Sequence, residues 1–244
     1  MASSSPSSSV RRGIWCQLGD PLATRIAALS GAEWICLDSQ HGLFDRAALT
    51  ASLAARGVGW APVAVRTAAL DAAEIGYALD AGADWVIVPL IETVEQAKLA
   101  VSASFYPPLG SRSWGPLTPL WAGSAPTVAQ ANAHRRPWIM IETAAGLEAV
   151  EDLVAVRGIG GVLVGPNDLA LSLGIDQDQM LADRSPASPL QRILAAARHA
   201  GLGGAGAFGG DPVRGARMAE QGFGWVVVGT DVAALDAGAR LLLA

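Results

Sequence analysis

The chain has 244 residues, of which 51% are hydrophobic and 16% are charged, and its formal net charge is −5. The absence of a basic stripe argues against nucleic acid as a partner, and no apolar run approaches the roughly 18 residues that cross a bilayer. Cys16 and Cys36 form no CxxC motif, so we expect buried thiols in a reducing compartment. These features predict a cytoplasmic protein that neither spans nor binds a membrane.

The first ten residues form a Ser-rich segment of low complexity, for which we expect a disordered tail. From residue 11 to residue 244, short apolar runs alternate with helical patterns. We predict strands at residues 13–18, 33–38, 61–66, 84–89, 138–142, 161–164, 203–207 and 224–228. We predict helices at 21–30, 45–57, 71–80, 93–103, 126–136, 144–154, 167–173, 190–200, 212–221 and 231–243, with an irregular stretch at 105–125 and a loop at 176–187.

The predicted strands are short and continuously apolar, as parallel strands buried on both faces are. A weak internal repeat supports them, because SGAEW, AGADW and QGFGW each place a glycine after a helix and a tryptophan at the start of a strand. Strands that alternate with helices over about 250 residues are typical of one architecture. We therefore predict a single-domain α/β protein, a (β/α)8 TIM barrel over residues 11–244.

Polar side chains gather where the predicted strands end, and barrel active sites lie at that end. The candidate site residues there are Asp38, Gln40, His41, Arg66, Glu142 and Asp168. Carboxylate oxygens favour a hard divalent ion, an arginine can stabilise an oxyanion, and a histidine can move a proton near neutral pH. Lys98, the only lysine, falls inside a helix, which argues against a Schiff-base mechanism and favours a metal for carbonyl activation.

Several motifs, taken in order and at consistent spacing, resemble the HpcH/HpaI aldolase family of class II pyruvate-dependent aldolases, the 4-hydroxy-2-oxoheptanedioate aldolase type. They are LDSQHG, VAVR, GADWVIVPLIETVEQA, YPPLGSRSWGP, IMIET and GVLVGPNDLALSLG. The resemblance implies a reversible aldol reaction that needs a divalent metal ion, Mg²⁺, Mn²⁺ or Co²⁺. A 4-hydroxy-2-oxo acid is cleaved through a metal-bound enolate to an aldehyde and pyruvate, or a close 2-oxo acid such as hydroxypyruvate.

The same resemblance assigns roles to residues. Glu142 and Asp168 match the metal ligands, Arg66 matches the arginine beside the ketone or enolate oxygen, and His41 matches the base that acts on the hydroxyl being cleaved. The backbone at Gly165, Pro166 and Asn167 matches the binding position of the pyruvate carboxylate, and Asp38 and Gln40 stand behind the directly acting groups. Gln40, Met140 and Asn167 depart from the usual family residues, which bears on the exact 2-oxo acid.

Asp80 matches an aspartate that pairs with the catalytic histidine, yet it ends a helix on the face of the barrel opposite His41. Either Asp80 reaches His41 of a neighbouring subunit, or this assignment fails and Asp80 is a surface helix-end acid. The family also implies a homo-oligomer, a hexamer built as a trimer of dimers, in which the last helix is exchanged between neighbours.

Four other functions remain open at this stage. Oxaloacetate decarboxylation would use the same site, and a lyase of the citrate lyase β or malyl-coenzyme A type would need a basic surface for nucleotide phosphates. A phosphate-binding isomerase would use the glycine-rich turns AFGGD and VGTD, but these turns also bring Asp211 and Asp231. A non-catalytic scaffold would not explain the cluster of polar side chains at the strand ends.

Overall fold

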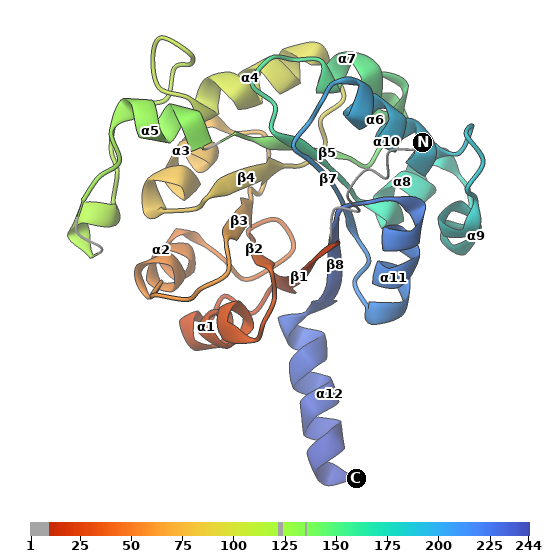
Figure 1. The fold of residues 1–244 in the computed structure, drawn as a ribbon. Helices are drawn as coiled ribbons and strands as arrows, with labels where there is room; N and C mark the ends of the chain where they lie inside the picture. Colours follow the sequence, from red (N-terminus) through yellow and green to blue (C-terminus); the bar gives the residue numbers. More distant parts are fainter. Residues whose placement is uncertain (1–9, 122–123, 135) are drawn as a thin grey trace, which may run out of the picture.

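The computed structural model describes residues 10–121, 124–134 and 136–244, which form a closed barrel of eight parallel strands (Figure 1). The strands are β1 (Arg11–Cys16), β2 (Trp34–Asp38), β3 (Val63–Arg66), β4 (Trp85–Val88), β5 (Trp138–Ile141), β6 (Gly161–Val164), β7 (Gly204–Phe208) and β8 (Trp225–Thr230). Each strand pairs with the next one along the chain, and β8 pairs with β1 to close the ring. The predicted (β/α)8 barrel is confirmed, whereas the predicted tail, apart from Val10, lies outside the described residues.

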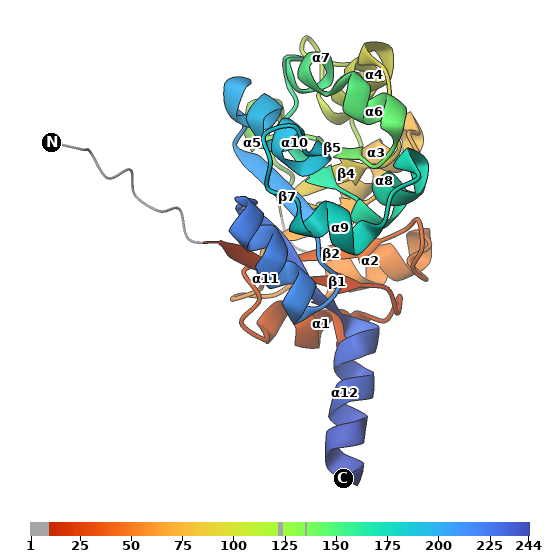
Figure 2. The same ribbon diagram turned by 90° about the vertical axis from the view of Figure 1, so that its right-hand side faces the viewer.

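Helices surround the barrel in both views (Figures 1 and 2). They are α1 (Pro21–Leu29), α2 (Arg46–Ala54), α3 (Ala72–Ala81), α4 (Val94–Ser104), α5 (Val128–His134), α6 (Ala144–Glu148), α7 (Val150–Val154), α8 (Pro166–Leu173), α9 (Gln177–Ala182), α10 (Pro189–His199), α11 (Pro212–Gln221) and α12 (Asp231–Leu243). Asp20, Asp45, Asp71 and Asp211 cap α1, α2, α3 and α11 by accepting backbone N–H groups of the first turn. Because these helices start where the strands end, the capping carboxylates lie at the same end of the barrel as the strand-end residues.

The predicted boundaries differ from the structure in a few places. The segment predicted as a loop at 176–187 contains α9, because Asp176 accepts the N–H of Gln179 and starts a helix there. The helix predicted at 144–154 is divided at Ala149, whose backbone belongs to neither α6 nor α7. A short 3₁₀ helix (Thr118–Leu120) lies in the stretch predicted to be irregular.

Tryptophan side chains fill the barrel at the end where the strands begin. Trp34, Trp85, Trp138 and Trp225 are the first residues of β2, β4, β5 and β8. The ring of Trp225 meets the other three rings edge-on, at centroid distances of 5.8, 5.6 and 5.3 Å. These rings occupy the lower barrel, so a ligand cavity inside the barrel belongs at the opposite end, where the strands finish.

Glycines on neighbouring strands make the room that these large rings need. A Cβ atom at Gly161 would lie 2.4 Å from Cε2 of Trp138, and one at Gly204 would lie 2.2 Å from Cζ2 of the same ring. Real Cβ atoms do not come this close to other heavy atoms. These two positions therefore need glycine because a side chain would collide with Trp138, and not because the backbone has an unusual conformation.

Both cysteines are fully buried and free, as expected for structural thiols. Burial, together with the smaller effect of the nearby Asp231 carboxylate, raises the pKa of Cys16 well above its ordinary value. Burial, followed by the charge of Asp38, does the same for the pKa of Cys36. The thiols therefore stay protonated near neutral pH and serve as packing groups.

The last helix, α12, projects away from the barrel as a separate rod in both views (Figures 1 and 2). Its buried residue is Asp231, at its start. Leu241, Leu242 and Leu243 near its end are 79–88% exposed. None of the helices in the described part of the chain combines the length and the hydropathy that a bilayer-spanning segment requires.

The tryptophan layer generates a stability prediction. Gly161→Ala forces Trp138 or the backbone to move, so we expect a loss of about 1–3 kcal/mol in the free energy of unfolding. Gly76→Ala is the matched control, because Gly76 lies within α3 and a Cβ atom there meets nothing within 4 Å. That control should be neutral or slightly stabilising. Denaturant unfolding measures both variants, and equal stabilities would refute the packing role.

Candidate active site

A cavity of about 160 Å³ opens at the end of the barrel where the strands finish. Its lining residues are Trp15, Gln17, His41, Arg66, Met140, Gly165, Pro166, Asn167, Asp168 and Phe208. The structure thus brings together His41, Arg66 and Asp168 with the Gly165–Asn167 turn, as expected from their positions at strand ends. Glu142 adjoins this cavity, because its side chain lies against Gly165.

Asp38 is the most densely hydrogen-bonded side chain of the site. It is fully buried and accepts bonds from Arg66 Nε (2.8 Å), Arg66 Nη2 (2.6 Å) and Trp15 Nε1 (3.1 Å). It also accepts the backbone N–H groups of Gln40 (3.0 Å) and His41 (3.3 Å). One carboxylate therefore fixes the arginine, an aromatic wall of the cavity and the backbone that carries His41.

Two opposing effects set the pKa of Asp38, namely its burial and its hydrogen bonds. Burial alone would raise the pKa of the carboxyl, but the hydrogen bonds and charge of Arg66, with the Trp15 N–H, outweigh burial and lower it below its ordinary value. The bidentate pair uses Nε and Nη2 of Arg66. Nη1 makes no hydrogen bond to the described residues, and since Arg66 lines the cavity it remains for a ligand there.

Glu142 follows β5 and is 2% exposed. Its Oε1 accepts the N–H of Leu90 at 2.8 Å. Leu90 has a φ of +56°, the one positive value among the described non-glycine residues, and this strained backbone aims its N–H at the carboxylate. Burial, with the negative charge of the nearby Asp168 as a smaller contribution, raises the pKa of Glu142.

The surroundings of Glu142 fit a divalent cation. A Cβ atom at Gly165 would lie 2.7 Å from Glu142 Oε2, so the absence of a side chain there keeps this oxygen accessible. Glu142 and Asp168 repel each other, and a cation between them removes that repulsion. Within the described part of the chain, no group of three or more His, Cys, Asp or Glu residues is arranged to hold a metal. Two carboxylates, completed by water and substrate, are nevertheless a usual donor set for Mg²⁺.

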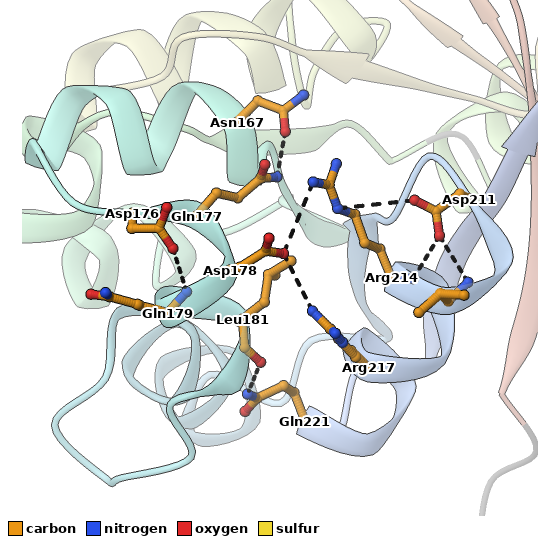
Figure 3. Close-up of polar contacts among 11 residues, drawn as sticks. Asn167, Asp176, Gln177, Asp178, Gln179, Leu181, Asp211, Arg214, Arg217 and Gln221 are labelled. Atoms are coloured by element: carbon orange, nitrogen blue, oxygen red, sulfur yellow. Dashed lines mark hydrogen bonds and ion pairs between the residues drawn. The ribbon is translucent and has the colours of Figure 1, made fainter.

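The turn from β6 into α8 provides backbone donors beside these acids. Gly165 is the N-cap of α8, its position offers no side-chain cap, and Pro166 occupies the first turn. The uncapped N–H groups at the start of a helix suit a carboxylate ligand. Asn167 accepts a hydrogen bond from Gln177 at the start of α9, so α9 braces this turn (Figure 3).

Figure 3 also shows how α9 is held against α11. Asp178 pairs with Arg217 at 3.3 Å and lies 3.9 Å from Arg214, while Gln221 Nε2 donates to the Leu181 carbonyl at 2.9 Å. The segment predicted to be a loop is therefore a helix anchored to α8 on one side and to α11 on the other.

Asp80 lies outside this cavity. It sits near the end of α3, where its Oδ1 accepts bonds from Arg112 and from the Tyr106 hydroxyl (3.2 Å). The buried Arg112 stacks on Tyr106 at 4.5 Å. Asp80 does not line the cavity that contains His41, in agreement with its predicted position on the opposite face.

Sequence reasoning missed three features of the cavity. Trp15, Gln17 and Phe208 line it, and they come from β1, the residue just after β1, and the end of β7. The sequence contained a partial indication of their role, because each of the three residues lies at or next to the end of a strand. Strand 1 was expected to continue to residue 18, which hid Gln17 inside a strand. Gln40, predicted to stand behind the site, has a buried Oε1 with no hydrogen-bond partner among the described residues.

The comparisons with known proteins agree with this geometry. The family model described as HpcH/HpaI aldolase/citrate lyase matches residues 11–236. A hydroxypyruvate/pyruvate aldolase of Roseovarius nubinhibens is 35% identical over 236 residues, which cover 95% of this chain and 90% of that protein. A 4-hydroxy-2-oxovalerate aldolase of Novosphingobium aromaticivorans is 38% identical over 68% of this chain and 64% of that protein. A solved HpcH/HpaI family protein of Burkholderia cenocepacia J2315 has a TM-score of 0.86 and 29% identity, covering 97% and 94% of the two chains.

The family match and these relatives, on a barrel with a polar cavity at its strand ends, identify a lyase that acts on carbon–carbon bonds. The chain belongs to the HpcH/HpaI aldolase/citrate lyase family. It is an aldolase, and its family is of the metal-dependent class that uses pyruvate-type donors.

The buried Asp38–Arg66 pair generates the second prediction. Asp38→Asn leaves the Arg66 charge without its counter-ion, so we expect a loss of about 3–5 kcal/mol in the free energy of unfolding at pH 7. Glu74→Gln breaks the exposed Arg46–Glu74 pair and should cost less than about 1 kcal/mol. A loss for Asp38→Asn as small as that of the control would contradict the role of the buried pair.

The pH dependence of this difference tests the same pair. Because the folded pKa of Asp38 lies below its unfolded value of about 3.9, its stabilising effect is complete above that pH. The effect is lost as pH falls through the folded pKa. The stability difference between wild type and Asp38→Asn should therefore stay constant from about pH 5 to 8 and shrink below about pH 4.

Proposed function

We propose that this enzyme is a divalent-metal-dependent aldolase that reversibly cleaves 4-hydroxy-2-oxo acids. Its products are an aldehyde and pyruvate, or a close 2-oxo acid such as hydroxypyruvate. The observation that carries the proposal is the buried Glu142 beside Asp168, on a cavity that also contains Arg66 and His41. The name of the Roseovarius relative, a hydroxypyruvate/pyruvate aldolase, supports the same class of donor.

Glu142 and Asp168 would hold the metal ion, for which Mg²⁺, Mn²⁺ and Co²⁺ are the candidates. When bound, such an ion acts as a Lewis acid that polarises the ketone of the 2-oxo acid. The N–H of Leu90 binds Oε1 of Glu142. The other oxygen, Oε2, lies against Gly165, beside the cavity. Gln40 contributes a buried acceptor behind the site that suits an ordered water.

The 2-oxo acid would bind between the start of α8 and Arg66. Pro166 has no backbone N–H, so the N–H groups of Asn167 and Asp168 would donate to the substrate carboxylate. Arg66 is held in place by Asp38 and offers its free Nη1 to the C2 oxygen. A permanently charged donor there stabilises the negative charge that develops on this oxygen.

The bond changes follow from this arrangement. In the cleavage direction, His41 takes the proton from the C4 hydroxyl, directly or through one water, as C4 becomes the aldehyde carbonyl. The electron pair of the C3–C4 bond moves to form the C2–C3 double bond, and charge collects on the C2 oxygen beside Arg66. Protonation at C3 then gives the 2-oxo acid. His41 is exposed in the single chain, so it can reach substrate and solvent alike.

The alternatives are less well supported. The N–H groups of the turns considered for phosphate are already bonded. Asp211 accepts those of Val213 and Arg214 at the start of α11, and at the start of α12 the side chains of Asp231 and Thr230 accept those of the next turn. Oxaloacetate decarboxylation fits the same residues and is the second candidate, since it also places charge on the C2 oxygen of pyruvate. A coenzyme A-dependent lyase of the citrate lyase type is favoured by the family description alone.

We also propose that the enzyme works as a homo-oligomer, a hexamer made of three dimers. The exposed leucines of the projecting α12 support this, because a helix that packs little on its own barrel needs a second copy to cover its apolar side. A cytoplasmic location stays a prediction from composition.

Asp80 belongs to the same proposal. Among the described residues, both hydrogen bonds to its carboxylate go to Oδ1, and the residue lines a groove of about 370 Å³ between α3 and the 111–113 segment. We propose that a neighbouring subunit presents its His41 rim to this groove, so that Asp80 orients that histidine. Arg112 and Tyr106 would then hold Asp80 in position.

The third prediction tests the metal. Enzyme stripped by a chelator should lose pyruvate release from a 4-hydroxy-2-oxo acid and recover it when Mg²⁺, Mn²⁺ or Co²⁺ is added back. Asp168→Ala should lower this activity by at least about 100-fold while the protein stays folded. Asp152→Ala removes an exposed acid on α7 and is the control that should retain activity. Full activity of the stripped enzyme would eliminate the metal mechanism.

The fourth prediction tests the shared site. His41→Ala and Asp80→Asn should each be nearly inactive as pure oligomers, because every site lacks one of the two groups. Oligomers assembled from a mixture of the two should recover a fraction of the wild-type rate, since some interfaces then combine an intact His41 with an intact Asp80. Circular dichroism checks that both variants fold. No recovery in mixed oligomers would show that Asp80 acts, if at all, within its own chain.

A further inference from the structure

One wall of the active-site cavity contains a polar side chain that the proposed mechanism does not use. Gln17 is the first residue after β1, is half-buried, and lines the cavity together with Trp15, Met140 and Phe208. Its side-chain amide makes no hydrogen bond to any other residue in the described part of the chain. Gln17 therefore offers an uncommitted donor and acceptor at the reaction chamber.

The backbone of Gln17 is fixed from both sides. Its N–H donates to Asp231 Oδ1 at 2.9 Å, and its carbonyl accepts the N–H of Leu43 at 2.7 Å. The next N–H, of Leu18, donates to the other oxygen of Asp231 at 3.1 Å. Asp231 is itself 7% exposed, at the start of α12. These bonds fix the position from which the amide enters the cavity, which is the preorganisation that a binding residue needs.

The rest of this wall offers little other polarity. The indole N–H of Trp15 is already donated to Asp38, and the ring of Phe208 meets that of Trp15 edge-on at 5.4 Å. Met140 also lines the cavity, but its side chain lies against Gly165 at the start of α8. In the proposed function, the 2-oxo acid occupies the part of the cavity at Glu142, Arg66 and the start of α8, and Arg66 borders the Trp15 ring at 5.1 Å. The wall of Trp15, Gln17 and Phe208 then remains for the aldehyde.

We propose that Gln17 contacts the aldehyde and selects one that carries a hydroxyl group on the carbon next to its carbonyl. This inference rests on the proposed aldolase function and names its aldehyde class. A hydroxyl group both donates and accepts, as does a carboxamide, so the two groups are complementary. The amide is neutral and attracts no carboxylate by charge, and the cavity of about 160 Å³ favours a short aldehyde.

The test compares two aldehydes of similar size with pyruvate as the donor. Glycolaldehyde carries a hydroxyl where propanal carries a methyl group. Gln17→Met keeps the length of the side chain and removes its hydrogen bonds. The ratio of kcat/KM for glycolaldehyde to that for propanal should fall about tenfold in this variant, and the KM for pyruvate should stay unchanged. Gln179→Met, the same substitution at an exposed position of α9, should leave the ratio as in the wild type.

A second measurement separates the two halves of the reaction. Exchange of the pyruvate methyl protons with D2O needs no aldehyde, so Gln17→Met should exchange them at the wild-type rate. An unchanged aldehyde ratio in an active variant would overturn the role of Gln17. So would a variant that loses exchange and both aldehydes equally, because that marks a structural role. A wild-type enzyme without metal-dependent aldol addition would instead overturn the proposed function, and this inference with it.

Discussion

A single buried carboxylate, Asp38, organises the catalytic end of this barrel. It joins β1, β2 and β3 by accepting hydrogen bonds from Trp15, from Arg66 and from the backbone that leads to His41. A buried acid is stable only when it is paired and fully hydrogen-bonded, and Asp38 meets both conditions. Its orientation is consequently fixed, and so are those of Arg66, Trp15 and the backbone of His41 around it.

The second carboxylate of the barrel interior has the opposite character. Glu142 is buried like Asp38, but Leu90 satisfies only one of its oxygens, and burial, with a smaller contribution from the charge of Asp168, raises its pKa. Asp38 and Glu142 thus have different roles. Asp38 is saturated by the protein and maintains the structure of the site, whereas Glu142 is left under-coordinated and disposed to bind a cation.

Much of this site was predictable, for reasons that particular residues illustrate. Parallel strands end at one rim, so Arg66, Glu142 and Asp168 had to converge once the strands were recognised. The tryptophans that begin β2, β4 and β8 occur in a repeated sequence pattern, which indicated that they occupy equivalent positions in the barrel. The ion pair between Asp38 and Arg66, the strained Leu90 and the anchored α9 were not predictable, because each depends on contacts between residues distant in sequence. Gln17 was hidden by an error of two residues at the end of the first strand.

In the mechanism proposed above, Glu142 and Asp168 together form a divalent-cation site that the fold leaves incomplete. Titration with Mn²⁺, followed by the electron paramagnetic resonance signal of the free ion, tests it without substrate. We expect the wild-type enzyme to remove about one Mn²⁺ per chain from solution, and Glu142→Gln and Asp168→Asn each to abolish this binding. Equal binding of Mn²⁺ by the wild type and both variants would show that these two carboxylates do not form the cation site.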